Sequence, residues 1–168
     1  MKTAALITVS ASAVLLSFSF SQRLKKRVKI LETLLIFISS VQTKIDYTAD
    51  RAEDIFSCAC ECENFSPLIF LGMTSGLIKN GEPINSAWKK GVEKYLSPIL
   101  RRSDIELLVS FGEAFGTSDA AGQISNCQIH IEMLSSSLAF SREQCAKFSL
   151  PIKTAGLLTA AAVYIIFL

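Results

Sequence analysis

Five cysteines and one histidine are the side chains with which this sequence could bind a metal ion or attack a substrate. Three of the cysteines lie at alternate positions, Cys58, Cys60 and Cys62. A structural zinc site joins a closely spaced cysteine pair to a second pair or to histidines, and His130 lies far along the chain. On a helix, Cys58 and Cys62 would share one face and Cys60 would point away. We therefore expect no metal site and predict small buried side chains with some exposed thiol.

The single histidine has no partner in the sequence that would make it catalytic. His130 lies between Gln128 and Glu132 in a stretch with helical spacing, so we expect a surface or half-buried position. No serine or cysteine in a recognisable nucleophile context accompanies it. The sequence contains neither a glycine-rich phosphate-binding motif nor His-Glu-x-x-His. We therefore predict a protein that is not an enzyme and that binds no cofactor; thiol chemistry at 58–62 is the enzymatic alternative.

The elements that must carry these residues are helical. No window alternates polar and apolar residues with period two, so no strand is expected. A long first helix is predicted to continue to about Cys62, and a long last helix has apolar residues at 3-4 spacing from Ile124 to Phe148. The predicted fold class is all-α, an antiparallel bundle of about five helices. Between the long helices we expect three shorter ones: residues 68–79 ending at Asn80-Gly81, a helix capped by Asn85 or Ser86, and a helix opened by a capping box of Ser103 and Glu106.

The apolar residues of the chain are concentrated at its two ends. Half of the residues are hydrophobic, and only 19% are charged. No charged side chain occurs in residues 3–22 or 154–168. About 20 apolar residues in a helix cross a bilayer. We therefore predict an N-terminal transmembrane helix over 1–22, a helical domain over 23–153 and a C-terminal transmembrane segment over 154–168.

A cluster of basic residues follows the first apolar segment and predicts the orientation of the chain. Basic residues that flank a span stay on the cytoplasmic side, so both termini are expected outside and 23–153 in the cytoplasm. A cleaved signal peptide is the alternative, because Ser17-Phe18-Ser19 resembles a cleavage site, but a signal peptide carries its charge before the apolar run. The cluster, called the basic neck below, consists of Arg23, Lys25, Lys26, Arg27 and Lys29.

The rest of the domain is acidic. Residues 30–153 carry 11 basic and 15 acidic side chains, a net charge of −4. Nucleic-acid binding requires a basic face on the domain itself, so it is not expected. The basic neck is instead expected to contact anionic lipid headgroups.

A short string in the second half of the chain resembles a known family signature. The pattern Phe-Gly-x-x-φ-Gly-x-Ser-Asp-x-x-x-Gln, where φ is apolar, resembles that of the stage III sporulation protein AB family. The wider layout agrees, with Lys44-Ile45-Asp46-Tyr47 in the first long helix and Trp88 in a later one. The residues that carry the signature are Phe111, Gly112, Phe115, Gly116, Ser118, Asp119 and Gln123.

The signature also has a purely structural interpretation. Gly112 lacks a Cβ and would permit close approach of another helix, while Gly116 can adopt the left-handed conformation that ends a helix. Ser118 or Asp119 would then cap the next helix. A tight helix-turn-helix corner explains the motif, and a direct contact with a partner protein is the alternative.

The resemblance implies a function that composition and spacing do not. The family is similar to the cytoplasmic domain of the inner-membrane platform protein of type II secretion systems and type IV pili. It implies a non-enzymatic platform in a secretion-like channel between mother cell and forespore, held in the mother-cell membrane. The implied partners are the other stage III A-operon proteins, including the AA secretion ATPase-like protein, and a homo-oligomer is left open. A small membrane-anchored signalling or sensor protein is the alternative.

Overall fold

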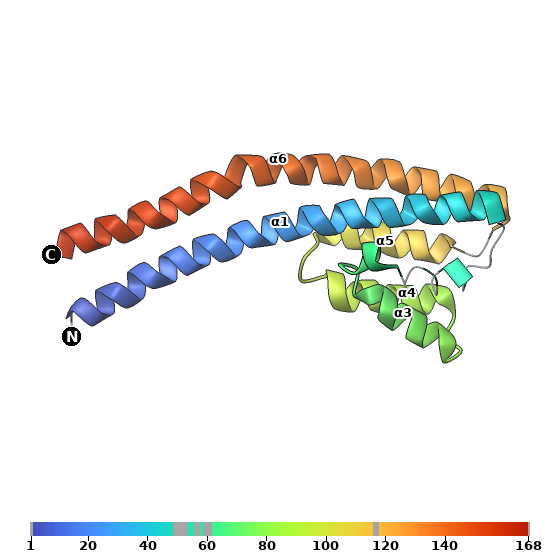
Figure 1. Cartoon of the computed structure of the whole chain (residues 1–168), viewed down its shortest axis with the longest axis horizontal. Helices are drawn as coiled ribbons and strands as arrows, with labels where there is room; N and C mark the ends of the chain where they lie inside the picture. Colours follow the sequence, from blue (N-terminus) through green and yellow to red (C-terminus); the bar gives the residue numbers. More distant parts are fainter. Residues whose placement is uncertain (1, 49–53, 56–57, 59–61, 116–117, 168) are drawn as a thin grey trace. The chain divides into compact units, whose positions relative to one another are not determined.

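All regular structure in the described part of the chain is helical. The computed structural model describes residues 2–48, 54–55, 58, 62–115 and 118–167 (Figure 1). Within them lie five α-helices, one 3-10 turn and no strand, which confirms the all-α prediction. The elements are α1 (Lys2–Thr48), η1 (Glu63–Phe65), α3 (Phe70–Lys79), α4 (Ile84–Leu96), α5 (Arg102–Ala114) and α6 (Ala120–Phe167).

The chain divides into two compact units. Residues 29–138 form one, and residues 1–28 together with 139–168 form the other. The first unit contains the inner part of α1, all the short helices and the start of α6, and it therefore holds every residue of the signature motif.

Trp88 of α4 is the centre of the core of the unit 29–138. Its side chain is fully buried. The indole stacks on Phe37 of α1 with ring centroids 5.9 Å apart, and it meets Phe70 of α3 and Phe111 of α5 edge-on at 5.0 and 5.5 Å. The indole N–H donates a hydrogen bond to the carbonyl oxygen of Leu108 at 2.7 Å. One side chain thus joins four helices and satisfies its own polar atom.

The first helix ends earlier than the sequence predicts. α1 ends at Thr48 and does not continue to Cys62. Ile55 and Phe65 line the same cavity as Phe37 and Val41 of α1, and all four side chains are buried. A single continuous helix could not place residues 55 and 65 against residues 37 and 41. Burial of these apolar side chains therefore overrides local helix propensity.

Two predicted helix starts are also wrong. α4 begins at Ile84, directly after Pro83, and neither Asn85 nor Ser86 is its cap. α5 begins at Arg102, and the carboxylate of Asp104 accepts the backbone N–H of Arg101 at 3.0 Å. The expected capping residue Glu106 is instead in an ion pair with Arg102 on the surface.

The end of α3 agrees with the sequence. The helix ends at Lys79, and the next two residues form the predicted Asn80-Gly81 stop. Gly81 has φ +88°, a conformation that side-chain-bearing residues rarely adopt. Close packing of α3 on α4 follows from another glycine, because a Cβ on Gly91 would lie 2.6 Å from Oγ1 of Thr74.

The ends of the chain are helical. In the residues that the structure describes, no helix has a stretch both long and apolar enough to cross a bilayer. The predicted transmembrane helices over 1–22 and 154–168 are therefore unsupported.

Candidate functional site

The signature motif forms the corner between α5 and α6, and its first half is buried. Phe111 is fully buried and Phe115 is 3% exposed. A Cβ on Gly112 would lie 2.1 Å from Cδ1 of Trp88, far inside van der Waals contact. Gly112 thus lets α5 approach the indole of Trp88 closely. Any larger side chain at this position would displace the indole or the helix.

The second half of the motif starts α6. Oδ1 of Asp119 accepts the backbone N–H of Gly122 at 2.9 Å, so Asp119, and not Ser118, is the capping side chain. The side-chain amide of Gln123 donates to the carbonyl oxygen of Ser118 at 3.0 Å. These two hydrogen bonds fix the first turn of α6. Gly116, the remaining motif residue, lies outside the described residues.

The structure separates the motif residues into two groups. Phe111, Gly112 and Phe115 are buried and cannot contact a partner, whereas Ser118 and Asp119 are exposed and Gln123 is half-buried. One charged residue of this surface occupies an unspecified position of the motif. Glu113 follows Gly112, and one of its carboxylate oxygens lies 3.9 Å from Nζ of Lys89 on α4. Helical periodicity could have predicted that Glu113 is exposed, because it follows a buried glycine on an amphipathic helix.

The only histidine of the sequence lies in the contact between α5 and α6. His130 is 7% exposed, so the expectation of a surface or half-buried position is wrong. Its Nδ1 lies 2.8 Å from the carbonyl oxygen of Asn126, and its Nε2 lies 3.1 Å from Oγ of Ser110. Because a carbonyl oxygen can only accept, Nδ1 carries a proton. Oγ of Ser110 also lies 2.8 Å from the carbonyl oxygen of Leu107, so its single proton is shared between this oxygen and the unprotonated Nε2 of His130. The Ser110–His130 pair therefore ties two helices together rather than presenting a nucleophile.

Two further polar contacts join the same helices. The buried carboxylate of Asp104 accepts the hydroxyl of Ser137 at 2.5 Å. The side-chain amide of Asn126 donates to the carbonyl oxygen of Phe111 at 3.5 Å. Together with the Ser110–His130 pair, these contacts form the α5–α6 seam.

The cysteines differ strongly in their surroundings. Cys127 on α6 is fully buried, and burial raises the pKa of its thiol to about 11. This thiol stays protonated and unreactive at neutral pH. Cys58 and Cys62 are exposed, so this pair belongs to the exposed thiol that the prediction allowed and not to its buried part. Cys60 lies outside the described residues.

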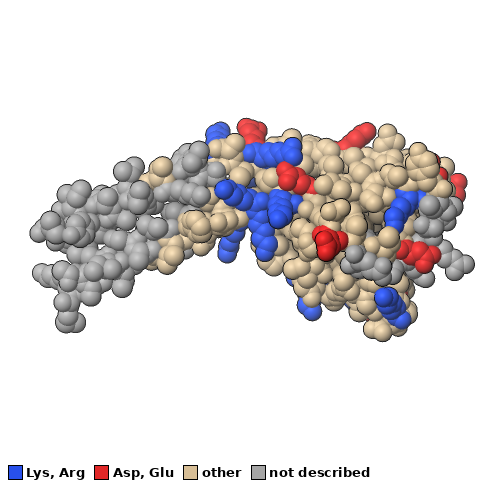
Figure 2. Space-filling model, viewed as in Figure 1, with Lys and Arg blue, Asp and Glu red and all other residues tan. Residues whose placement is uncertain are grey.

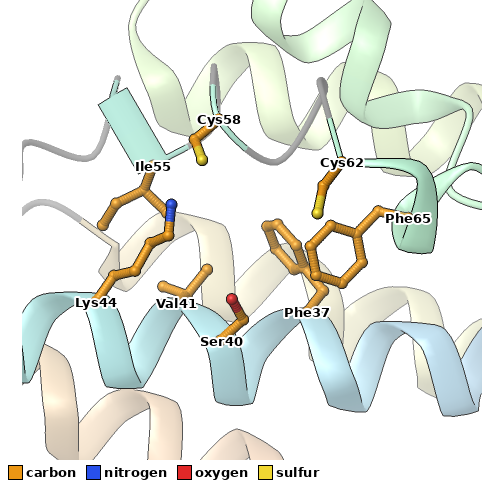
Figure 3. Close-up of a pocket in the computed structure, with 8 residues that line it drawn as sticks. All are labelled: Phe37, Ser40, Val41, Lys44, Ile55, Cys58, Cys62 and Phe65. Atoms are coloured by element: carbon orange, nitrogen blue, oxygen red, sulfur yellow. The ribbon is translucent and has the colours of Figure 1, made fainter.

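Cys58 and Cys62 line one cavity of about 70 Å³ (Figure 3). Phe37, Val41 and Lys44 of α1 form its other side. No group of three or more potential metal-ligating side chains occurs within the described ranges of the chain.

The basic neck is mostly exposed. Arg23, Lys25, Lys26 and Lys29 are exposed, while Arg27 is buried at 6% exposure. Figure 2 shows basic side chains gathered over the middle of α1. Four of the five predicted basic residues are thus accessible to an anionic surface.

Comparison with protein families gives a match over almost the entire chain. The model of the family described as stage III sporulation protein AB matches residues 2–168. The resemblance seen in the motif is thereby confirmed. No curated protein and no solved structure matches the chain.

Proposed function

Because the chain belongs to the stage III sporulation protein AB family, we propose that this sporulation protein is a non-enzymatic platform of a secretion-like channel between mother cell and forespore. In this role it assembles with other stage III A-operon proteins and docks the AA secretion ATPase-like protein. The observation that carries the proposal is the α5–α6 corner. Its buried residues, such as Gly112, pack against Trp88. Its exposed residues, such as Asp119, present polar side chains at the capped start of α6.

The start of α6 suits a docking surface because two of its side chains are held by hydrogen bonds before binding. Gln123 and Asp119 each hydrogen-bond within the turn, so little conformational entropy remains to be lost when a partner binds. Glu113 and Asp119 give the surface a negative charge, with Lys89 beside Glu113. A partner with basic side chains fits this surface.

The test measures binding of the full chain to purified AA ATPase-like protein. Asp119→Asn removes the charge but retains a good helix cap, and Glu113→Gln removes the second carboxylate. We expect this double variant to bind about tenfold more weakly, equivalent to about 1.4 kcal/mol. Glu106→Gln is the matched control, because Glu106 is also an exposed carboxylate on α5 but lies outside the corner. Equal binding by the double variant and the wild type would exclude the corner as the docking surface.

We propose in addition that the chain is held at the mother-cell membrane, with both termini outside and residues 23–153 in the cytoplasm. The exposed part of the basic neck supports contact with anionic lipid, at about 1 kcal/mol for each residue near the surface. Flotation with anionic vesicles should fall when Arg23, Lys25, Lys26 and Lys29 are replaced by Gln. Replacement of four lysines on α3 and α4, at positions 79, 89, 90 and 94, is the control. Equal flotation of both variants would contradict the proposal.

A further inference from the structure

Large apolar side chains are exposed on both helices of the unit that contains the two chain ends. On α1, Leu15, Phe18 and Phe20 are 66%, 51% and 49% exposed, and on α6 Phe148 is 38% exposed. Ser21, which follows Phe20, is fully buried, so α1 is packed on one side at this level and presents Phe20 on another. Single exposed apolar residues are common, but a group of them next to polar residues marks an interaction site.

The exposed rings of the two helices lie at one level. α1 and α6 run antiparallel and side by side within this unit (Figure 1). The unit ends at Val28 on α1 and at Ala139 on α6. Phe20 lies 8 residues from Val28, and Phe148 lies 9 residues from Ala139. With a rise of ~1.5 Å per residue, both rings lie roughly 12–14 Å from these ends, within one helical turn of each other.

Basic side chains follow the rings in the same direction on both helices. On α1, the exposed residues Arg23 and Lys25 of the basic neck lie between Phe20 and the end of the unit. On α6, Lys147 is exposed on the same side of Phe148, and its Nζ lies 5.8 Å from the centre of the Phe148 ring. Both helices, which are distant in sequence, thus place an apolar ring toward the chain end and cations on the opposite side of that ring.

This order of side chains matches that of a protein at a bilayer interface. Apolar rings insert at the boundary between headgroups and acyl chains, and nearby cations bind the phosphates of anionic lipids. We propose that Phe18, Phe20 and Phe148 form an aromatic belt in the headgroup–acyl boundary of an anionic bilayer, with Leu15 deeper among the acyl chains. This inference rests on the proposed membrane attachment and adds α6 to the surface that contacts lipid.

The depth of individual side chains in the bilayer tests this arrangement. The full chain is reconstituted into vesicles of phosphatidylglycerol and phosphatidylcholine, with one tryptophan replacing Leu15, Phe20, Phe148 or Phe140. Lipids that carry bromine either near the headgroup or in the middle of the acyl chain quench tryptophans at the depth of the bromine. Trp88 is fully buried, so the wild type supplies the background emission.

The belt predicts an order of depths. Phe20→Trp and Phe148→Trp should each lose about half or more of their added emission to bromine near the headgroup. Leu15→Trp should be quenched more strongly by bromine in the middle of the chain, because it lies roughly 7 Å farther along α1. Phe140→Trp is the matched control, since Phe140 is 42% exposed on α6 but directly follows Ala139. It should be quenched at least about fivefold less.

The result distinguishes failure of the belt from failure of the membrane attachment. A wild-type chain that does not float with anionic vesicles would overturn both. If the wild type floats, but Phe20→Trp and Phe148→Trp are quenched no more than Phe140→Trp, the attachment stands and the belt is overturned. Emission shifted to shorter wavelength without quenching would also overturn the belt, because it would show that protein, such as a second copy of the chain, covers the rings.

Discussion

Two regions of the unit 29–138 are held together by different interactions. Around Trp88, four helices meet through aromatic rings, and the stabilisation comes from burial of apolar surface. Along the α5–α6 seam, the contacts are polar and directional, between Asp104 and Ser137 and between Ser110 and His130. Burial tolerates small shifts, whereas hydrogen bonds are lost over fractions of an ångström. The aromatic core therefore provides stability, and the seam sets the register of α6 on α5.

The largest effect is expected in the aromatic core. Trp88→Ala should lower the free energy of unfolding by about 3–5 kcal/mol, because it leaves a cavity among four helices. Trp88→Phe should cost less, since it loses the hydrogen bond to Leu108 but retains an aromatic ring. Urea unfolding followed by circular dichroism measures both. A loss below about 1 kcal/mol for Trp88→Ala would show that Trp88 is not the centre of the core.

The second effect concerns the buried thiol of α6. Burial raises the pKa of the Cys127 thiol from its ordinary value of 9.0 to about 11 in the folded protein. Between these values the unfolded chain releases this proton and the folded chain keeps it, so stability falls as pH rises from 9 to 11. The contribution is on the order of 2–3 kcal/mol, because each pKa unit corresponds to about 1.4 kcal/mol. Urea unfolding at several pH values should show this part of the slope in the wild type and not in Cys127→Ala; identical slopes would contradict burial of the thiol.

The third prediction tests the contact between corner and core. Gly112→Ala should destabilise the protein by about 2 kcal/mol, because the new Cβ would overlap the indole of Trp88. Gly76→Ala on α3 is the matched control. Nothing lies within 4 Å of a Cβ there, so the better helix propensity of alanine should stabilise the protein by about 0.5–1 kcal/mol. Thermal unfolding of both variants should give opposite signs, and equal signs would contradict the close approach.

The smallest effect is expected in the seam. A double-mutant cycle of Asp104→Ala and Ser137→Ala should give a coupling free energy of about 1.5 kcal/mol, typical of a hydrogen bond to a charged group. The same cycle for Asp104 and Glu106, which point to different surroundings, is the control and should give a value near zero. A seam coupling that is also near zero would remove the distinction between the two regions.

Local features of the fold could be predicted where the cause is local. The stop of α3 at Asn80-Gly81 follows from the left-handed conformation of a glycine, and the cap at the start of α6 follows from a short polar side chain. The start of α5 could not be predicted in the same way. Ser103 and Glu106 satisfy the capping-box pattern, but Asp104 takes the capping role. Its carboxylate also accepts a hydrogen bond from the hydroxyl of Ser137, which lies 33 residues later in the chain.

The candidate site could be found from sequence only as a motif. The pattern at residues 111–123 marked the corner, yet it gave buried and exposed members equal weight. Which motif residues are buried depends on the indole of Trp88, because it packs against Gly112 and against the ring of Phe111. Burial of His130 likewise depends on Ser110, 20 residues earlier in the chain.

The all-α class and the family follow from the sequence alone, because helical periodicity and a contiguous motif are properties of neighbouring residues. The position of Trp88 in the space left by Gly112, and the opening of Cys58 and Cys62 into a cavity beside Lys44, follow only from the folded structure. These juxtapositions arise from the packing of distant segments. Spacing along the chain contains no information about which faces meet across a core.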